Sequence, residues 1–281
     1  MTRDLQYATT YARRAGLARD LPEGDNESLR WVSNTATLIY GERDAVLVDT
    51  FTTIEQNEQL IEWVHGFDRN LTYVYITHGH GDHCFGVKQL QEAFPDVRAV
   101  ATARTVEACR QQGSPEFVDS FWGALFPGQI PMPQVAPEAL DGDSFELEGH
   151  RLEVIETGFS DTHDTTALWV ADLRLVVAGD VAYSGIHLYT PETTTETRSQ
   201  WARATGRLKD LDPVFVVAGH KRPERDDDPG ILAETEQYLL DFNRTEAETT
   251  TPIELYEAML ALYPDRANPG ALWSGAKAAK A

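Results

Sequence analysis

The feature that most constrains the fold is a cluster of metal-binding side chains in residues 77–86, which read Thr-His-Gly-His-Gly-Asp-His-Cys-Phe-Gly. The cluster follows an apolar, β-branched run at residues 71–76. Imidazole nitrogen and carboxylate oxygen bind divalent metals at about 2.0–2.2 Å, so the chain must let several of them converge, and we expect Gly79 and Gly81 to give it that freedom. A polar turn facing solvent needs no such spacing, so the pattern predicts a metal-binding loop at a strand end. Its four candidate ligands are His78, His80, Asp82 and His83.

Three further candidate ligands follow later strands. His163 lies in the segment Gly-Phe-Ser-Asp-Thr-His-Asp. Asp180 ends Val-Val-Ala-Gly-Asp and His220 ends Val-Val-Ala-Gly-His, so each comes just past the carboxyl end of a predicted buried strand. Taken singly these residues are typical of turns or helix starts. Because a rigid sheet holds such loops in fixed positions, we expect the three to join the first four in one site.

The order of these motifs resembles the metallo-β-lactamase superfamily, over about residues 30–222. The Leu-Val-Asp-Thr strand end at residues 47–50 is also similar to the opening strands of that family. The resemblance implies an α/β fold, a four-layer αββα sandwich. By analogy with binuclear members, it implies one metal bound by His78, His80 and His163, a second bound by Asp82, His83 and His220, and a bridging Asp180.

The whole chain, residues 1–281, is predicted to form one domain with its core at about residues 30–222 and a helical extension at 229–281. A short helical pattern covers residues 7–17. Residues 113–136 contain four prolines, so no helix of any length is expected there. We interpret this segment as an apolar flap whose Phe121 and Trp122 contact substrate, although an insertion packed for its own stability fits the pattern equally well.

Composition limits the partners. The net charge of −21 repels phosphate backbones and anionic lipid headgroups, so no nucleic acid and no membrane are expected. We expect instead a small-molecule substrate with little or no charge. Two cysteines give no disulfide framework, and the first residues show no signal-peptide pattern, so the expected location is cytoplasmic. A homodimer is left open.

The predicted ligands are nitrogen and carboxylate oxygen without thiolate, which suits Zn²⁺ and also Mn²⁺ or Fe²⁺. Two divalent ions lower the pKa of a bridging water and so supply hydroxide, and Asp82 is placed to carry a proton to the leaving group. In the family that the chain resembles, a bridging aspartate such as Asp180 favours ester, lactone or thioester hydrolysis. Tyr183 stands where acyl-homoserine lactonases have a tyrosine that aids the carbonyl oxygen, although a core tyrosine is an equally good interpretation. His187 is a further candidate substrate contact.

Three other functions stay open from the sequence. They are hydrolysis of β-lactams, oxygenation of persulfides by a single iron, and binding without catalysis. Metal content would distinguish the iron oxygenase from a binuclear hydrolase. The intact set of candidate ligands argues against binding without catalysis.

Overall fold

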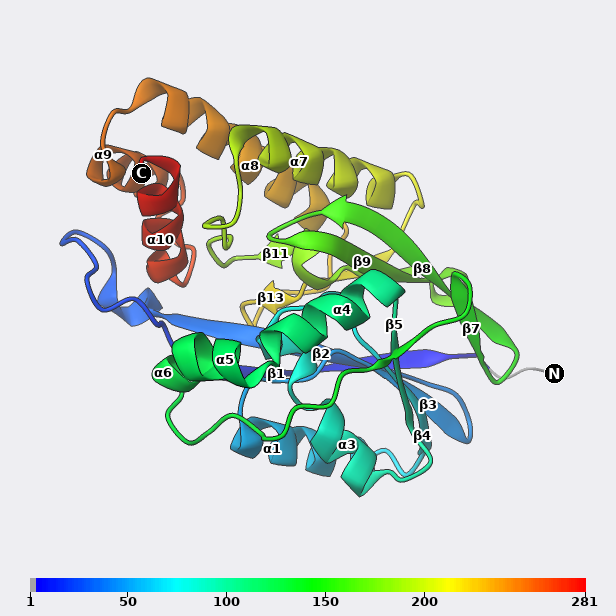
Figure 1. Cartoon of the computed structure of the whole chain (residues 1–281). Helices are drawn as coiled ribbons and strands as arrows, with labels where there is room; N and C mark the ends of the chain where they lie inside the picture. The colour runs from blue at the N-terminus through cyan, green and yellow to red at the C-terminus, as the bar shows by residue number, and fades with distance from the viewer. Residues whose placement is uncertain (1–3) are drawn as a thin grey trace.

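The structure, a computed structural model, describes residues 4–281 and is built on two stacked sheets (Figure 1). The six strands of the first sheet run in the order β1-β2-β3-β4-β5-β6, with β1, β2 and β3 antiparallel and the later pairs parallel. Their bounds are β1 Gln6–Ala15, β2 Trp31–Tyr40, β3 Asp44–Val48, β4 Asn70–Tyr75, β5 Arg98–Ala101 and β6 Glu138–Ala139.

The second sheet has five strands in the order β12-β10-β9-β8-β7. A short parallel pair, β11 with β13, forms a separate ladder. The bounds are β7 Ser144–Leu147, β8 His150–Phe159, β9 His163–Val170, β10 Leu175–Val177, β11 Tyr183–Ser184, β12 Phe215–Val217 and β13 His220–Lys221.

Helices cover the outer face of each sheet (Figure 1). One apolar cluster joins α1, α3 and α4 to the first sheet, a second joins α7 and α8 to the second sheet, and a third fills the space between the sheets. Three apolar layers between four structural layers confirm the predicted αββα sandwich. The helices are α1 Ile54–His65, α2 Gly81–Cys84, α3 Val87–Ala93, α4 Ala103–Gln112, α7 Thr195–Lys209, α8 Ile231–Glu248, α9 Pro252–Leu262 and α10 Pro269–Ala279.

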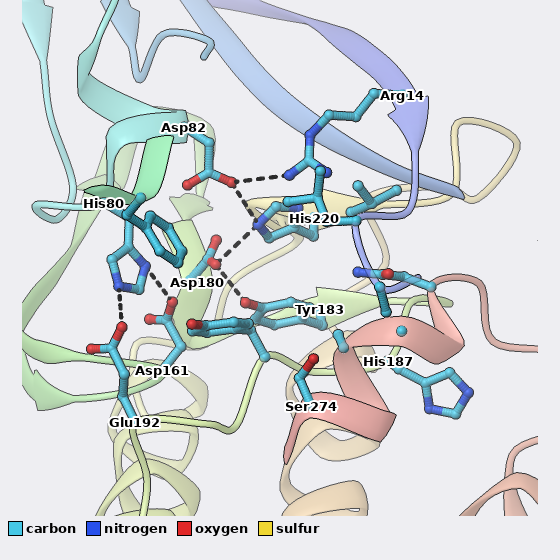
Figure 2. Close-up of a pocket in the computed structure, with 18 of the residues that line it drawn as sticks. Arg14, His80, Asp82, Asp161, Asp180, Tyr183, His187, Glu192, His220 and Ser274 are labelled. Carbon is cyan, nitrogen blue, oxygen red and sulfur yellow. Dashed lines mark hydrogen bonds and ion pairs between the residues drawn. The ribbon is translucent and has the colours of Figure 1, made fainter. Parts of the chain in front are cut away.

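The N-terminal segment is a strand, so the helix predicted at residues 7–17 is wrong. β1 pairs with β2 along its whole length, from Gln6 opposite Tyr40 to Ala15 opposite Trp31. Ten residues of unbroken pairing outweigh a weak local helical pattern. The pairing also brings Arg14, near the end of β1, to the same side of the molecule as the metal-binding loop (Figure 2).

The segment predicted to lack helix is partly helical. α5 Pro115–Phe117, the π-helical turn Val118–Trp122 and α6 Gly123–Leu125 follow one another directly. Pro115 is tolerated because it occupies the first turn, where a backbone N–H is not needed, and the Ser114 side chain caps that turn. The other prolines come after α6, where the chain is irregular as predicted.

The C-terminal part is helical, as the sequence predicts, and consists of α8, α9 and α10. Thr251 and Glu254 form a capping box at the start of α9. α10 packs back toward the rim of the metal-binding loop and contributes to the cavity described below. Across residues 4–281, no helix combines the length and apolar character that a membrane span requires.

Candidate metal centre

Loops at the carboxyl ends of four strands bring the candidate ligands together (Figure 2). The first loop follows β4 and contains α2, and the others lie between β8 and β9, after β10 and after β12. All the side chains that meet here are buried. Within the described chain, three overlapping groups have ligand atoms within 4.8 Å of one another: His78, His80 and Asp161; His78, His83 and Asp180; and Asp82, His83 and His220.

The groups share His78 and His83, so they form one continuous cluster. Asp180 reaches ligands on both sides of this cluster, because its Oδ1 is 3.3 Å from His83 Nε2, its Oδ2 is 3.1 Å from His220 Nε2, and it lies within 4.8 Å of a ring nitrogen of His78. This arrangement is what a bridging carboxylate requires.

Several buried polar atoms of the cluster lie close to one another without making a hydrogen bond of good geometry. Such atoms are costly to leave unpaired and need a polar or ionic partner. Because they are imidazole nitrogens and carboxylate oxygens that face one another, a divalent cation fits them. They are His78 Nε2, His83 Nε2, Asp161 Oδ2 and Asp180 Oδ1.

The opposite nitrogen of each imidazole is fixed by a hydrogen bond. His78 Nδ1 donates to Thr77 Oγ1 at 3.0 Å, and His83 Nδ1 donates to Asp49 Oδ2 at 3.0 Å. His220 Nδ1 donates to the Ser33 carbonyl at 2.9 Å. A proton on Nδ1 leaves the lone pair of Nε2 free for a metal, as in many metal-binding histidines.

His80 is oriented the other way. Its Nδ1 lies 2.8 Å from Asp161 Oδ2, inside the cluster, and its Nε2 lies 3.2 Å from Glu192 Oε1 at the rim. Glu192 also accepts a hydrogen bond of 2.8 Å from Thr162. Glu192 therefore orients the His80 ring, a role that the sequence did not reveal.

The structure does not bring His163 into the cluster, and Asp161 takes the place predicted for it. His163 begins β9 with an exposed side chain whose ring packs edge-on against Phe159, 4.6 Å between centroids. Asp161 is buried two residues earlier, and Ser160 donates to its Oδ1 at 2.8 Å. The reason is strand pairing, since His163 lies opposite Phe159 in the β8–β9 ladder and faces outward.

The glycines of the first loop have a different role from the one predicted. Neither Gly79 nor Gly81 has a positive φ. A Cβ at Gly79 would lie 2.3 Å from the Cβ of Ala108, and one at Gly81 would lie 2.5 Å from the Phe85 ring. Close packing of the loop, not conformational freedom, requires glycine at both positions.

The electrostatics of the cluster favour ionised carboxylates beside imidazoles. Burial acts to raise the pKa of Asp180, but His220 and His83 outweigh burial and hold that pKa well below its usual range. Burial lowers the pKa of His78 to about 4, so this ring is neutral and able to bind a metal at physiological pH.

The Tyr183 side chain contacts the cluster directly. Its hydroxyl donates to Asp180 Oδ2 at 2.5 Å, and its ring stacks on His220 with centroids 5.1 Å apart. Burial and the neighbouring Asp180 raise the pKa of Tyr183, so the phenol keeps its proton.

A cavity of about 190 Å³ opens above the cluster, with His80, Asp82, Asp180 and His220 in its lining. Its walls come from the end of β1, the helical segment at 115–125 and α10. Four residues predicted from the sequence to lie near the metals line this cavity: Phe121, Trp122, Tyr183 and His187.

His187 Nδ1 is hydrogen-bonded to the Tyr238 hydroxyl at 2.9 Å, and its buried Nε2 has no partner. The sequence did not indicate Arg14 or Tyr189, which also line the cavity.

Comparison with known proteins agrees with this geometry. The family described as "Metallo-beta-lactamase superfamily" matches residues 29–220, which is more than half of the chain. The chain belongs to this superfamily. Membership of this superfamily of metal-dependent hydrolases confirms the resemblance seen in the sequence.

The curated proteins whose sequences match this chain are distant relatives. Hydroxyacylglutathione hydrolases from two strains of Vibrio cholerae serotype O1 are 28% identical over 114 residues, which are 41% of this chain. The match spans about a third, 34%, of the length of those relatives.

Solved structures of metallo-beta-lactamases share the fold. The enzyme from Pontibacter korlensis has a TM-score of 0.60 at 18% identity, over 86% of this chain and 97% of that one. The DIM-1 enzyme exposed to ceftazidime has a TM-score of 0.61 at 18% identity, over 86% and 99% of the two chains. At such identities the likeness shows the fold alone.

Proposed function

We propose that this protein is a binuclear metal-dependent hydrolase that cleaves an ester, lactone or thioester bond of a small molecule. The observation that carries the proposal is the overlap of three ligand groups through His78 and His83, with Asp180 close to His78, His83 and His220. The family membership and the similarity to hydroxyacylglutathione hydrolases support the same chemistry.

In this proposal one divalent ion, Zn²⁺ in preference to Mn²⁺ or Fe²⁺, is bound by three residues of the first half and another by three of the second. Asp180 is a ligand of both. When bound, such a pair supplies hydroxide at neutral pH and polarises the carbonyl of the substrate. The first half is His78, His80 and Asp161, and the second is Asp82, His83 and His220.

The residues of the chain perform the remaining tasks. Asp82 Oδ2 accepts a hydrogen bond of 2.8 Å from Asn34, which fixes the carboxylate at the cavity wall. A carboxylate held there is suited to pass a proton to the leaving group. Tyr183 holds Asp180 in position through its hydroxyl, and its proposed donation to the carbonyl oxygen requires that bond to be exchanged for one to substrate.

The cavity supports a substrate with an apolar part. The tilted rings of Phe117 and Phe121 have centroids 5.5 Å apart, and Phe121 packs edge-on against Trp122 at 5.1 Å, so one wall is aromatic. An acyl or aryl group placed against this wall would have its carbonyl near the cluster. A cytoplasmic location and a small-molecule substrate remain predictions.

The test is reconstitution followed by a screen. Protein freed of metal with a chelator is reloaded with Zn²⁺, Mn²⁺ or Fe²⁺, and hydrolysis is followed across lactones, thioesters, aryl esters and β-lactams. We expect metal-dependent cleavage of at least one of the first three classes. Loaded protein that cleaves none of them would contradict the proposal, and a single iron with oxygen consumption on a persulfide would replace it with the oxygenase.

A further inference from the structure

Arg14 extends from the end of β1 into the cavity beside the cluster (Figure 2). Its Nη2 is 3.9 Å from Asp82 Oδ2, and the guanidinium lies over the Phe126 ring, 5.3 Å from the centroid. Only 15% of the side chain is exposed. The guanidinium is therefore largely removed from water and has an aromatic surface behind it.

This guanidinium makes no hydrogen bond to any part of residues 4–281, and its buried Nε has no partner at all. Two more deeply buried arginines of the protein do have hydrogen-bond partners. Arg198 donates to Asn243 and Thr193, and Arg266 donates to the Ile186 carbonyl. A buried group with five donors normally satisfies them, so the donors of Arg14 are available to a molecule in the cavity.

Arg14 is also the only lysine or arginine among the described residues that line the cavity. The ion pair with Asp82 does not occupy it fully, because 3.9 Å is longer than a hydrogen bond. In the proposed function Asp82 shares its charge with a metal, which leaves the guanidinium without a full counterion. The overall charge of −21 therefore does not describe this part of the cavity.

We propose that Arg14 binds a carboxylate of the substrate and makes the enzyme selective for acyl compounds that carry a carboxylate close to the scissile bond. This inference rests on the proposed function for the reaction itself. The planar fork of a guanidinium matches a carboxylate through two parallel hydrogen bonds. A single cation in a cavity that Asp82 and Glu192 also line favours a monoanion over a phosphate dianion, because like charges repel.

Two esters that differ only at one end test the selectivity. The mono-4-nitrophenyl ester of succinic acid carries a carboxylate where 4-nitrophenyl butyrate carries a methyl group. With zinc-loaded protein, the ratio of kcat/KM for the succinyl ester to that for the butyryl ester should fall about tenfold or more in Arg14→Gln. Arg14→Lys keeps the charge but loses the fork, so its ratio should fall less.

Arg13→Gln is the matched control. Arg13 is the neighbouring residue of β1, but it is exposed and stacks over Trp31, 4.0 Å from the ring. The control removes the same charge from the same strand and should leave the ratio of the two esters within about twofold of the parent. An equal fall in both variants would mean that overall charge, not Arg14, sets the preference, and would overturn the proposal.

A binding measurement separates this inference from the proposed function. Succinate should raise the melting temperature of the zinc-loaded parent and of Arg13→Gln, and raise it much less in Arg14→Gln. If neither ester is cleaved but succinate still stabilises the parent more than Arg14→Gln, the proposed hydrolysis is refuted and the carboxylate site is supported. If both esters are cleaved, the ratio of their kcat/KM values is the same in Arg14→Gln as in the parent, and succinate stabilises all variants equally, the proposed hydrolysis is supported and the role of Arg14 is refuted. Should Arg14→Gln fail to fold, the same comparisons with Arg14→Lys decide the matter.

Discussion

Asp180 lies 3.3 Å from His83 and 3.1 Å from His220 in the second half of the cluster, and within 4.8 Å of a ring nitrogen of His78 in the first. Asp180→Ala should lower kcat by about a hundredfold or more, because it removes a ligand from the site that stabilises the transition state. His80→Ala should behave alike. Asp143→Ala, which removes an exposed carboxylate near β7, is the control and should retain full activity. Circular dichroism of each variant shows whether the fold is kept, and near-parental hydrolysis by folded, metal-free Asp180→Ala would refute the mechanism.

His187 should make stability depend on pH. Burial, with a smaller effect of Arg266, lowers the pKa of His187 to about 3, against 6.5 for an ordinary histidine. Between these values the unfolded chain takes up a proton that the folded chain excludes, so the free energy of unfolding falls as pH falls from 6.5 toward 3. For this one residue the slope approaches about 1.4 kcal/mol per pH unit.

The measurement is urea unfolding at pH 5 and pH 7 in the presence of a chelator. His187→Gln should reduce the difference in unfolding free energy between the two pH values. His65→Gln, which changes an exposed histidine of α1, should not. Equal pH dependence in His187→Gln and the parent would show that His187 is not buried in its neutral form.

At this scale the sequence predicted six of the seven side chains that form the cluster but not the seventh, Asp161. The histidine-rich loop was identifiable because its ligands are contiguous. Asp161 was not, because a carboxylate in a polar loop is common and His163, two residues later, is the more usual metal ligand. The choice between them depends on which side chain the β8–β9 pairing turns inward, and pairing is not a local property.

At the scale of elements, the helical segment at 115–125 should contribute to substrate binding. Phe121 is 40% exposed and lines the cavity, whereas Trp122 also packs on Phe85 and donates to Gln112. Phe121→Ala is thus the cleaner variant. It should raise KM for apolar esters by about three- to tenfold with little change in kcat, because contacts made equally in ground and transition states are lost.

Leu240→Ala is the control for this variant, since Leu240 is an exposed apolar residue of α8 and does not line the cavity. Steady-state kinetics on a series of esters of increasing acyl length provide the test. If Phe121→Ala and Leu240→Ala both match the parent throughout the series, the segment is packing alone.

Elements defined by local chemistry were predictable, and those defined by distant partners were not. The capping box of α9 and the apolar stripe of α1 each depend on a few residues that are close together in the sequence. β1 becomes a strand because it pairs with β2, a separate segment of the chain, and this pairing could not be inferred from the residues of β1 alone. Proline spacing was misjudged at residues 115–125 because a proline at a first helical turn does not break the helix.

At the scale of the whole molecule, the cluster ties both sheets together, since its ligands come from the strand ends of each. Metal should therefore add to folding stability, because the ligands converge only in the folded state. At a hundred times its dissociation constant, a bound ion contributes about 2.7 kcal/mol. Removing it should lower the melting temperature by several degrees.

Calorimetry with and without a chelator measures this shift. Asp180→Ala provides the control, since a variant that binds less metal should lose less stability to the chelator. An unchanged melting temperature in the parent, with metal loss verified by analysis, would show that the cluster is not coupled to folding through metal.

The most direct test of the whole account is the metal content of two alanine variants, determined by elemental analysis after equilibration with Zn²⁺. The proposed function predicts two equivalents per chain in the parent and about one in Asp161→Ala, because Asp161 belongs to the first half of the cluster. His163→Ala should retain both, because its side chain is exposed and outside the cluster. Full occupancy in Asp161→Ala together with loss of an ion in His163→Ala would contradict the site described above.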